Sequence, residues 1–124
     1  MKILFEIQLR DIVENAKFFA QLNQKPLRAK TAYKIATLIR ELEPHLANYN
    51  DIYNSLLEKY GTLEDDEKKR YTFSLEQKEL FDKEYVELLN EAIQINCNKI
   101  NIADLDEIEI SASQMRQMMP FIEE

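Results

Sequence analysis

The residue types that most often carry catalysis or metal binding are scarce in this chain. It has one histidine, His45, and one cysteine, Cys97. A tetrahedral zinc site of the Cys/His type needs four such ligands, so one copy of the chain does not supply it. A Ser-His-Asp or Cys-His arrangement would have to use His45, which lies on the flank of a helical pattern where nothing suggests a general base. We therefore interpret His45 as a surface or rim histidine.

Two groups of carboxylates remain, because a magnesium site or a two-carboxylate hydrolase needs no histidine. They are Glu-Asp-Asp-Glu at residues 64–67, and Asp104, Asp106, Glu107 and Glu109. The first falls in a charged connection, and the second alternates with apolar residues like the outer face of a strand. Neither has the order of an EF-hand loop. We expect surface charge here and predict no catalytic residue, no metal site and no cofactor.

Glycine content excludes further classes of function, and net charge disfavours others. Gly61 is the only glycine, so the glycine-rich phosphate loops of Walker and Rossmann proteins are absent. The net charge of −7 disfavours nucleic acid and anionic membranes as partners. Basic residues do gather over 25–40, and we interpret them as a solvated helix face, with a phosphate-binding strip as the alternative: Lys25, Arg28, Lys30, Lys34 and Arg40.

Composition indicates a single domain over residues 1–124. One Gly and three Pro among 124 residues are too few for the many tight turns of a barrel or sandwich. A lone cysteine excludes a disulfide-stapled domain. The first residues lack the apolar core of a signal peptide, and no apolar run approaches the roughly 20 residues of a membrane helix. We expect a cytoplasmic protein that does not enter a membrane.

Alternation and capping residues define the first elements. Residues 2–9 alternate apolar and polar side chains and predict a half-buried strand. Asp11 followed by Glu14 predicts a capping box that opens a helix ending near Leu22. Pro26 is suited to the first turn of the next helix.

An apolar seam is the strongest pattern in the sequence. It predicts a helix over 27–60 that Gly61 ends with a left-handed cap. Pro44 lies at the outermost position of the heptad, and we favour one kinked helix over two helices. The seam residues recur at alternating steps of three and four: Ala32, Ile35, Ile39, Leu42, Leu46, Tyr49, Tyr53, Leu56 and Tyr60.

The remaining residues predict a second helix and the other strands. Residues 62–70 should form an exposed connection and 71–73 a short strand. Ser74 and Gln77 form a capping box that opens a helix over 75–95 with its own heptad stripe. Alternation over 99–102 and 107–110 predicts a strand hairpin. Ser111 or Ser113 should cap a last short helix, which must end before Pro120.

Together these elements predict an α+β fold: a long heptad-patterned helical hairpin with a small antiparallel sheet and short flanking helices. The sheet should contain residues 2–9, 99–102 and 107–110. Because the seam of the 27–60 helix is longer than the 75–95 helix can cover, we expect two copies to pair along it.

The tyrosines and methionines are the candidate partner interface. They fit either a partly buried core or an aromatic-rich, adaptable contact surface. We predict that the chain binds a protein, which could be a second copy of itself. The six interface candidates are Tyr49, Tyr53, Tyr60, Met115, Met118 and Met119.

Three segments follow the short N-terminal strand along the chain. They are Pro-Leu-Arg-Ala-Lys at 26–30, Leu-Leu-Glu-Lys-Tyr-Gly at 56–61 and Met-Pro-Phe-Ile-Glu-Glu at 119–124. This order resembles a family of small uncharacterised proteins of tailed bacteriophages and prophages, which implies a bacterial host cell. The leading hypothesis is a non-enzymatic assembly or adaptor protein. An acidic inhibitor of a host nucleic-acid-binding or defence protein is the alternative, and a carboxylate/metal enzyme ranks last.

Overall fold

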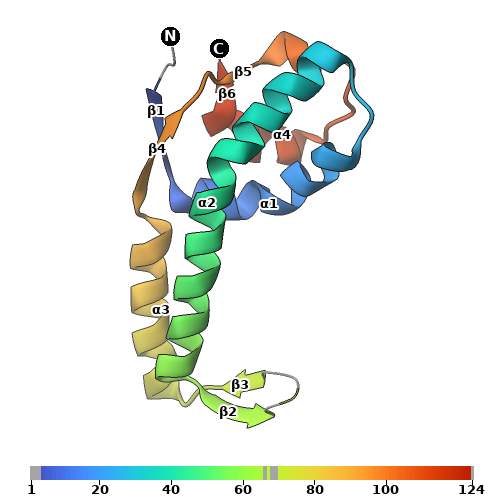
Figure 1. The fold of residues 1–124 in the computed structure, drawn as a ribbon. Helices are drawn as coiled ribbons and strands as arrows, with labels where there is room; N and C mark the ends of the chain where they lie inside the picture. Colours follow the sequence, from blue (N-terminus) through green and yellow to red (C-terminus); the bar gives the residue numbers. More distant parts are fainter. Residues whose placement is uncertain (1–3, 66, 68–69, 124) are drawn as a thin grey trace.

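Helix α2 (Ala29–Tyr60) runs the length of the molecule and organises the rest of it. A computed structural model describes residues 4–65, 67 and 70–123. Figure 1 shows a head around the first half of α2, and an arm in which its second half pairs with α3 (Leu75–Leu89). We call residues 43–91 the arm and the other described residues the head. The predicted α+β class with a helical hairpin is confirmed.

Helix α2 continues through Pro44, so the prediction of one helix over two is confirmed. The Pro44 side chain is exposed on the outer face, where a missing backbone hydrogen bond can be replaced by water. The start of the helix was predicted wrongly, because Pro26 lies before it and not in its first turn. Leu27 packs against the core and Arg28 is extended, so the helical turn begins only at Ala29.

Strand β1 (Leu4–Gln8) leads directly into α1 (Leu9–Gln24). The predicted capping pair Asp11 and Glu14 is wrong, since the N-cap is Gln8, three residues earlier. Asp11 instead lies inside the first turn, and its carboxylate accepts a hydrogen bond from the Gln8 backbone N–H at 3.0 Å. Residues 2 and 3 of the predicted strand lie outside the described residues.

The predicted helix over 75–95 is too long. Helix α3 ends at Leu89, and Ala92–Asn96 forms strand β4, antiparallel to β1. Ile93 and Ile95 fit a helical stripe and a two-residue alternation equally well, so local pattern alone was ambiguous. Pairing with β1 makes this segment a strand, because Ile7 faces Ile93 and Phe5 faces Ile95 across the ladder.

The connection at the far end of the arm is exposed where it is described, and it contains a strand near 71–73, both as predicted, but it also contains a second strand that was not predicted. Strand β2 (Thr62–Asp65) pairs antiparallel with β3 (Arg70–Thr72). Gly61 was expected in a left-handed conformation, but its backbone is extended, with φ −88° and ψ 161°. Glycine is required there for space, since a Cβ atom would lie 2.7 Å from the Leu57 carbonyl oxygen.

The C-terminal part contains β5 (Ile100–Asn101), a 3₁₀ turn (Ile102–Leu105), α4 (Ala112–Met118), a second 3₁₀ turn (Met119–Phe121) and β6 (Ile122–Glu123). The predicted hairpin of 99–102 with 107–110 is wrong, because β5 pairs in parallel with β6. The Asn101 side chain accepts from the Ala103 N–H at 2.9 Å and turns the chain away after β5. Ser111, and not Ser113, caps α4, which ends before Pro120 as predicted.

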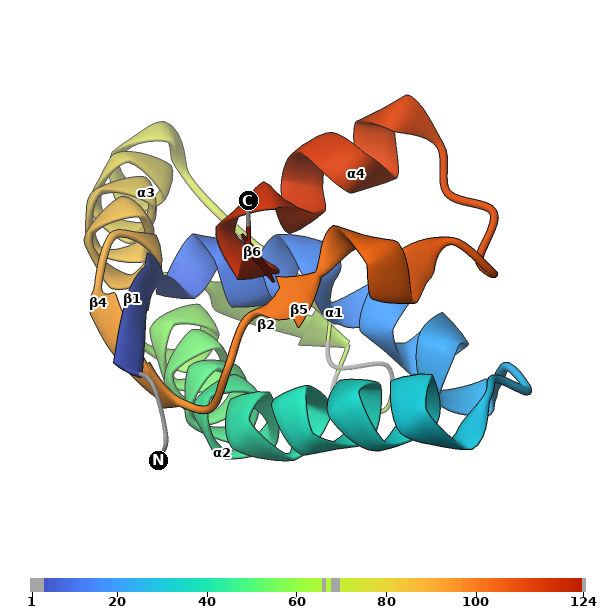
Figure 2. The ribbon, with the colours of Figure 1, turned by 90° about the horizontal axis from the view of Figure 1, so that it is seen from above.

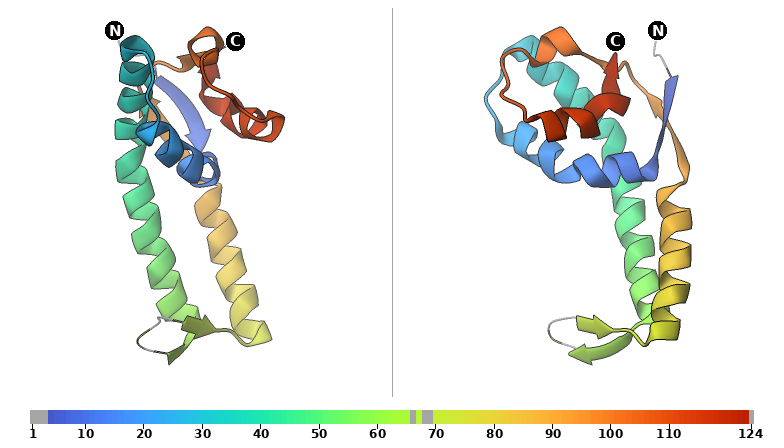
Figure 3. Two further views of the ribbon diagram at one scale, coloured as in Figure 1. Left: turned by 90° about the vertical axis from the view of Figure 1, so that its right-hand side faces the viewer. Right: turned by 180° about the vertical axis from the view of Figure 1, so that it is seen from behind.

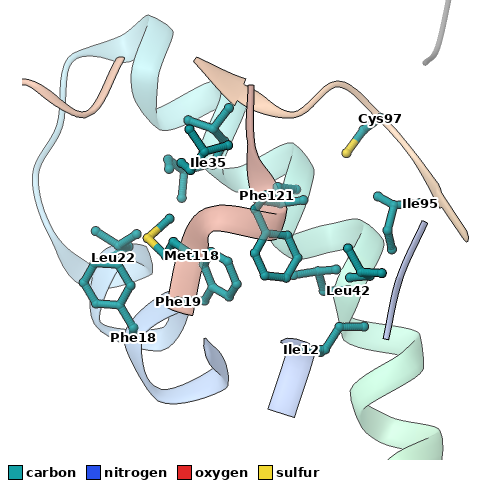
Figure 4. Close-up of a cluster of buried hydrophobic side chains, with 14 of the residues drawn as sticks. Ile12, Phe18, Phe19, Leu22, Ile35, Leu42, Ile95, Cys97, Met118 and Phe121 are labelled. Carbon is teal, nitrogen blue, oxygen red and sulfur yellow. The ribbon is translucent and has the colours of Figure 1, made fainter. Parts of the chain in front are cut away.

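The buried core lies in the head, where α1 is sandwiched between α2 and α4 (Figure 2). Phe121 is completely buried and packs edge-on against Phe19, with the ring centres 5.2 Å apart (Figure 4). The Asn15 side chain links α1 to α4 by donating to the Gln117 carbonyl at 2.9 Å. The arm extends away from this core, as the side view shows (Figure 3).

Candidate functional site

Aromatic side chains from both helices hold the arm together. Tyr49 and Tyr53 of α2 face Phe81 and Tyr85 of α3, because spacings of four residues place each pair on one helix face. Tyr53 is 6.0 Å from Phe81 and 5.6 Å from Tyr85 between ring centres. The Tyr49 and Tyr85 hydroxyls are 2.9 Å apart and share a hydrogen bond.

The hydrogen bond between the Tyr49 and Tyr85 hydroxyls forms a bridge between α2 and α3. Burial raises the pKa of Tyr49 well above its ordinary range, and the hydrogen bond with Tyr85 raises it further. The hydroxyl therefore stays protonated at neutral pH.

The six predicted interface residues lie in two separate places. Tyr49 and Tyr53 are half-buried between the helices, and Tyr60 lies at the end of α2. Met118 is wholly buried in the head, and Met115 packs against that core. Met119 is 60% exposed, so it alone among the three candidate methionines is freely accessible to a partner. Tyr49, Tyr53 and Met118 thus serve the fold, which seam periodicity alone does not reveal.

The expected surplus of apolar seam on α2 does not exist. Ile35, Leu38 and Leu42, in its first half, are buried in the core of the head. Helix α1, which we had treated as a flanking element, packs against this half of α2. The expected pairing of two copies along the long helix therefore has no support from this half of α2.

The acidic group at 104–109 faces the basic stretch at 25–40. Glu107 pairs with Arg28 at 3.2 Å, and Asp104 pairs with Lys34 at 2.7 Å. These acids were expected on the outer face of a strand, but they fasten the C-terminal segment to the start of α2. Among the residues that the structure describes, no three His, Cys, Asp or Glu side chains are grouped to hold a metal ion.

Negative charge is concentrated in the arm, a feature that the overall net charge hides. Residues 43–91 contain 13 Asp and Glu against six Lys and Arg, whereas the rest of the chain contains ten of each. The whole net charge of −7 therefore belongs to the arm. This contrast becomes visible only once the fold shows where the arm begins and ends (Figure 1).

The arm also presents apolar side chains to solvent. Among the described residues, eight large apolar side chains are exposed, and five of them lie in the arm: Ile52, Leu63, Leu75, Leu80 and Val86. Leu75 is the most exposed of all, at 80%. Leu80 and Val86 were missed from sequence because they lie off the heptad stripe of α3.

No protein-family model, curated protein or solved structure matches the chain. Within the described part of the chain, no helix combines the length and apolarity that crossing a membrane requires.

Proposed function

We propose that the chain is a non-enzymatic interaction protein whose arm contacts a protein partner, in an adaptor or assembly role. The observation that carries the proposal is the arm itself: a projecting two-helix hairpin with most of the exposed large apolar side chains and all of the net charge. Apolar surface rimmed by polar residues is typical of protein contact sites.

We also propose the cellular location in which the protein acts. The resemblance to small tailed-bacteriophage and prophage proteins supports a role in the cytoplasm of a bacterial host. The carboxylates at 104 and 107 are engaged by Lys34 and Arg28, which supports an interaction role over a carboxylate/metal enzyme.

Site-specific photo-crosslinking in bacterial cells tests the arm as the contact surface. A photoreactive amino acid is placed at Leu75 or Val86 in the arm, and at the exposed Ala112 in the head as a matched control. We expect discrete crosslinked products from the two arm positions and none from the control. Equal products from all three positions, or none from the arm, would contradict the proposal.

The mass of the crosslinked product separates the two roles. A product with twice the chain mass, together with a dimer or larger ring by light scattering, supports self-assembly. A product with a different protein, from a chain that is monomeric alone, supports an adaptor.

An acidic inhibitor of a nucleic-acid-binding protein is a second candidate, favoured by the concentration of charge in the arm. Such an inhibitor must release its partner when nucleic acid is added, and its binding must weaken steeply with salt. An adaptor that uses the exposed apolar side chains keeps its partner under both conditions.

A further inference from the structure

A groove of about 200 Å³ lies between α1 and α2, where the head meets the arm. Its floor is made by the core side chains Ile12, Phe19 and Leu42, which lie close together in Figure 4. Ala16 lines one wall, and Leu46 lines the other. Because alanine ends at its Cβ atom, the backbone of another molecule can approach α1 closely at this wall.

The size of the groove limits what it can hold. Sites for cofactors and drug-sized ligands usually have volumes of roughly 300–1,000 Å³. A groove of about 200 Å³ is below that range and suits one large apolar side chain. Because the groove is open to solvent between two helices, such a side chain can enter as part of a polypeptide.

The negative charge beside the groove determines which residues of a partner are favoured next to that apolar side chain. Glu43 lines the groove and is exposed, and it is the first residue of the arm with its net charge of −7. A cationic residue next to the apolar anchor would therefore be favoured, and an acidic one repelled. Two copies of this chain would bring two negatively charged arms together, and this repulsion opposes a second copy as the occupant.

The surface also continues beyond the groove along α2. Ile39, Glu43, Leu46 and Asn50 are spaced by four, three and four residues, so they lie on one face of the helix. The first three line the groove, and Asn50 extends the same face into the arm. A helix laid along this face can place one side chain in the groove and present its neighbours to Glu43.

We propose that this groove binds a basic amphipathic helix of a partner protein, with one apolar side chain in the groove and a Lys or Arg beside Glu43. This mode is the helix-in-groove type of recognition. The inference rests on the proposed function, since it names the chemistry of the partner and a second contact at the base of the arm.

The probe is a synthetic amphipathic helical peptide of leucine and lysine, with a leucine and glutamate peptide of the same pattern as its control. Binding is followed by NMR of the methyl groups in the full-length protein. We expect the Leu/Lys peptide to shift the methyl signals of Ile39 and Leu46 and to leave those of Leu63 at the arm tip unchanged. No shift at the groove, or equal shifts with both peptides, would overturn the proposal.

Two matched pairs of variants test the groove and its carboxylate separately. Ala20→Phe fills the groove from an exposed position, whereas Ala47→Phe adds the same ring to α2 outside it. Glu43→Lys and Glu58→Lys make the same change of charge at exposed positions on α2. We expect Ala20→Phe to abolish the groove shifts and Glu43→Lys to weaken binding about tenfold, with each control within about twofold of the unmodified protein.

Other results of the peptide-binding experiment would indicate a different role for the groove. Equal losses for Glu43→Lys and Glu58→Lys would mean general attraction to the acidic arm and would overturn the groove as a specific site. Concentration-dependent shifts of the groove methyls without peptide would assign the groove to a second copy and also overturn the proposal. Arm crosslinks that persist when the groove fails would leave the proposed function standing.

Discussion

The head and the arm share helix α2 but are held together by different side chains. In the head, residues from α1, α2, α4 and the short strands form one cluster of fully buried apolar groups, including Ile12, Leu38 and Phe121. In the described part of the arm, only Leu56 and Phe81 are buried, and half-buried tyrosines make ring contacts between the helices. The head therefore contains nearly all of the buried core among the described residues, and the arm contains little of it.

The difference in packing implies a difference in local stability. Regions with few buried apolar contacts open at a lower free energy than the global unfolding of the protein. We expect α3 to open before α1 or α4, and the variants below probe this ordering from the largest effect to the smallest.

Phe121→Ala should have the largest effect. Phe121 is wholly buried and contacts both Phe19 and Phe5 edge-on. Removing such a ring typically costs about 3–5 kcal/mol of unfolding free energy, a large fraction of the stability of a small domain. Urea unfolding followed by circular dichroism measures the loss. The exposed neighbour Met119→Ala is the control and should change the unfolding free energy by less than about 0.5 kcal/mol.

Phe81→Ala makes the same kind of deletion in the arm, and we expect a smaller and more local effect. Its cost should be about 2 kcal/mol, since neighbouring side chains on a thin two-helix arm can collapse into the space. Hydrogen exchange should show faster exchange of α3 amides, with α1 and α4 still protected. Uniform acceleration in all three helices would show that head and arm unfold as one unit.

A serine–glutamine capping box occurs in each part and allows a matched comparison. Ser74 accepts from the Gln77 N–H in the arm, and Ser111 accepts from the Gln114 N–H in the head. Each Ser→Ala change should cost about 1 kcal/mol. We expect Ser74→Ala to speed exchange in α3 only, whereas Ser111→Ala should lower the global stability, because α4 leads directly into Phe121. Substitution by Asp, which also caps, should restore both.

The same contrast explains how much could be predicted from sequence. The long helix, the Ser74 cap and the helical hairpin were predictable, because heptad spacing and capping are local in sequence, whereas Ser111 was one of two candidates for the last cap. The strand at 92–96 and the parallel pair of β5 and β6 were not, because distant partners decide them: Ile7 faces Ile93, and Ile100 faces Ile122.

The candidate surfaces were harder to predict than the fold. Tyr49 and Tyr53 have the spacing of an interface, but α3 covers them, and only the structure shows which face it covers. Leu75 and Val86 follow no stripe, so periodicity does not mark them. The role proposed for Glu43 depends on α1, because the groove that Glu43 lines is formed between residues distant in sequence.

Tyr49→Phe should have the smallest effect and adds a dependence on pH. Because the pKa of Tyr49 is raised in the folded state, its contribution to stability is fully present below the unfolded pKa of about 10 and is lost as pH rises further. Removing the hydroxyl takes away one hydrogen bond, worth roughly 0.5–1 kcal/mol at neutral pH. It should also make the decline of unfolding free energy above pH ~10 shallower. Urea unfolding at neutral and alkaline pH measures both changes. Identical alkaline slopes for the two proteins would mean that the Tyr49–Tyr85 bridge opens before either hydroxyl ionises, and that the arm is looser than its ring contacts indicate.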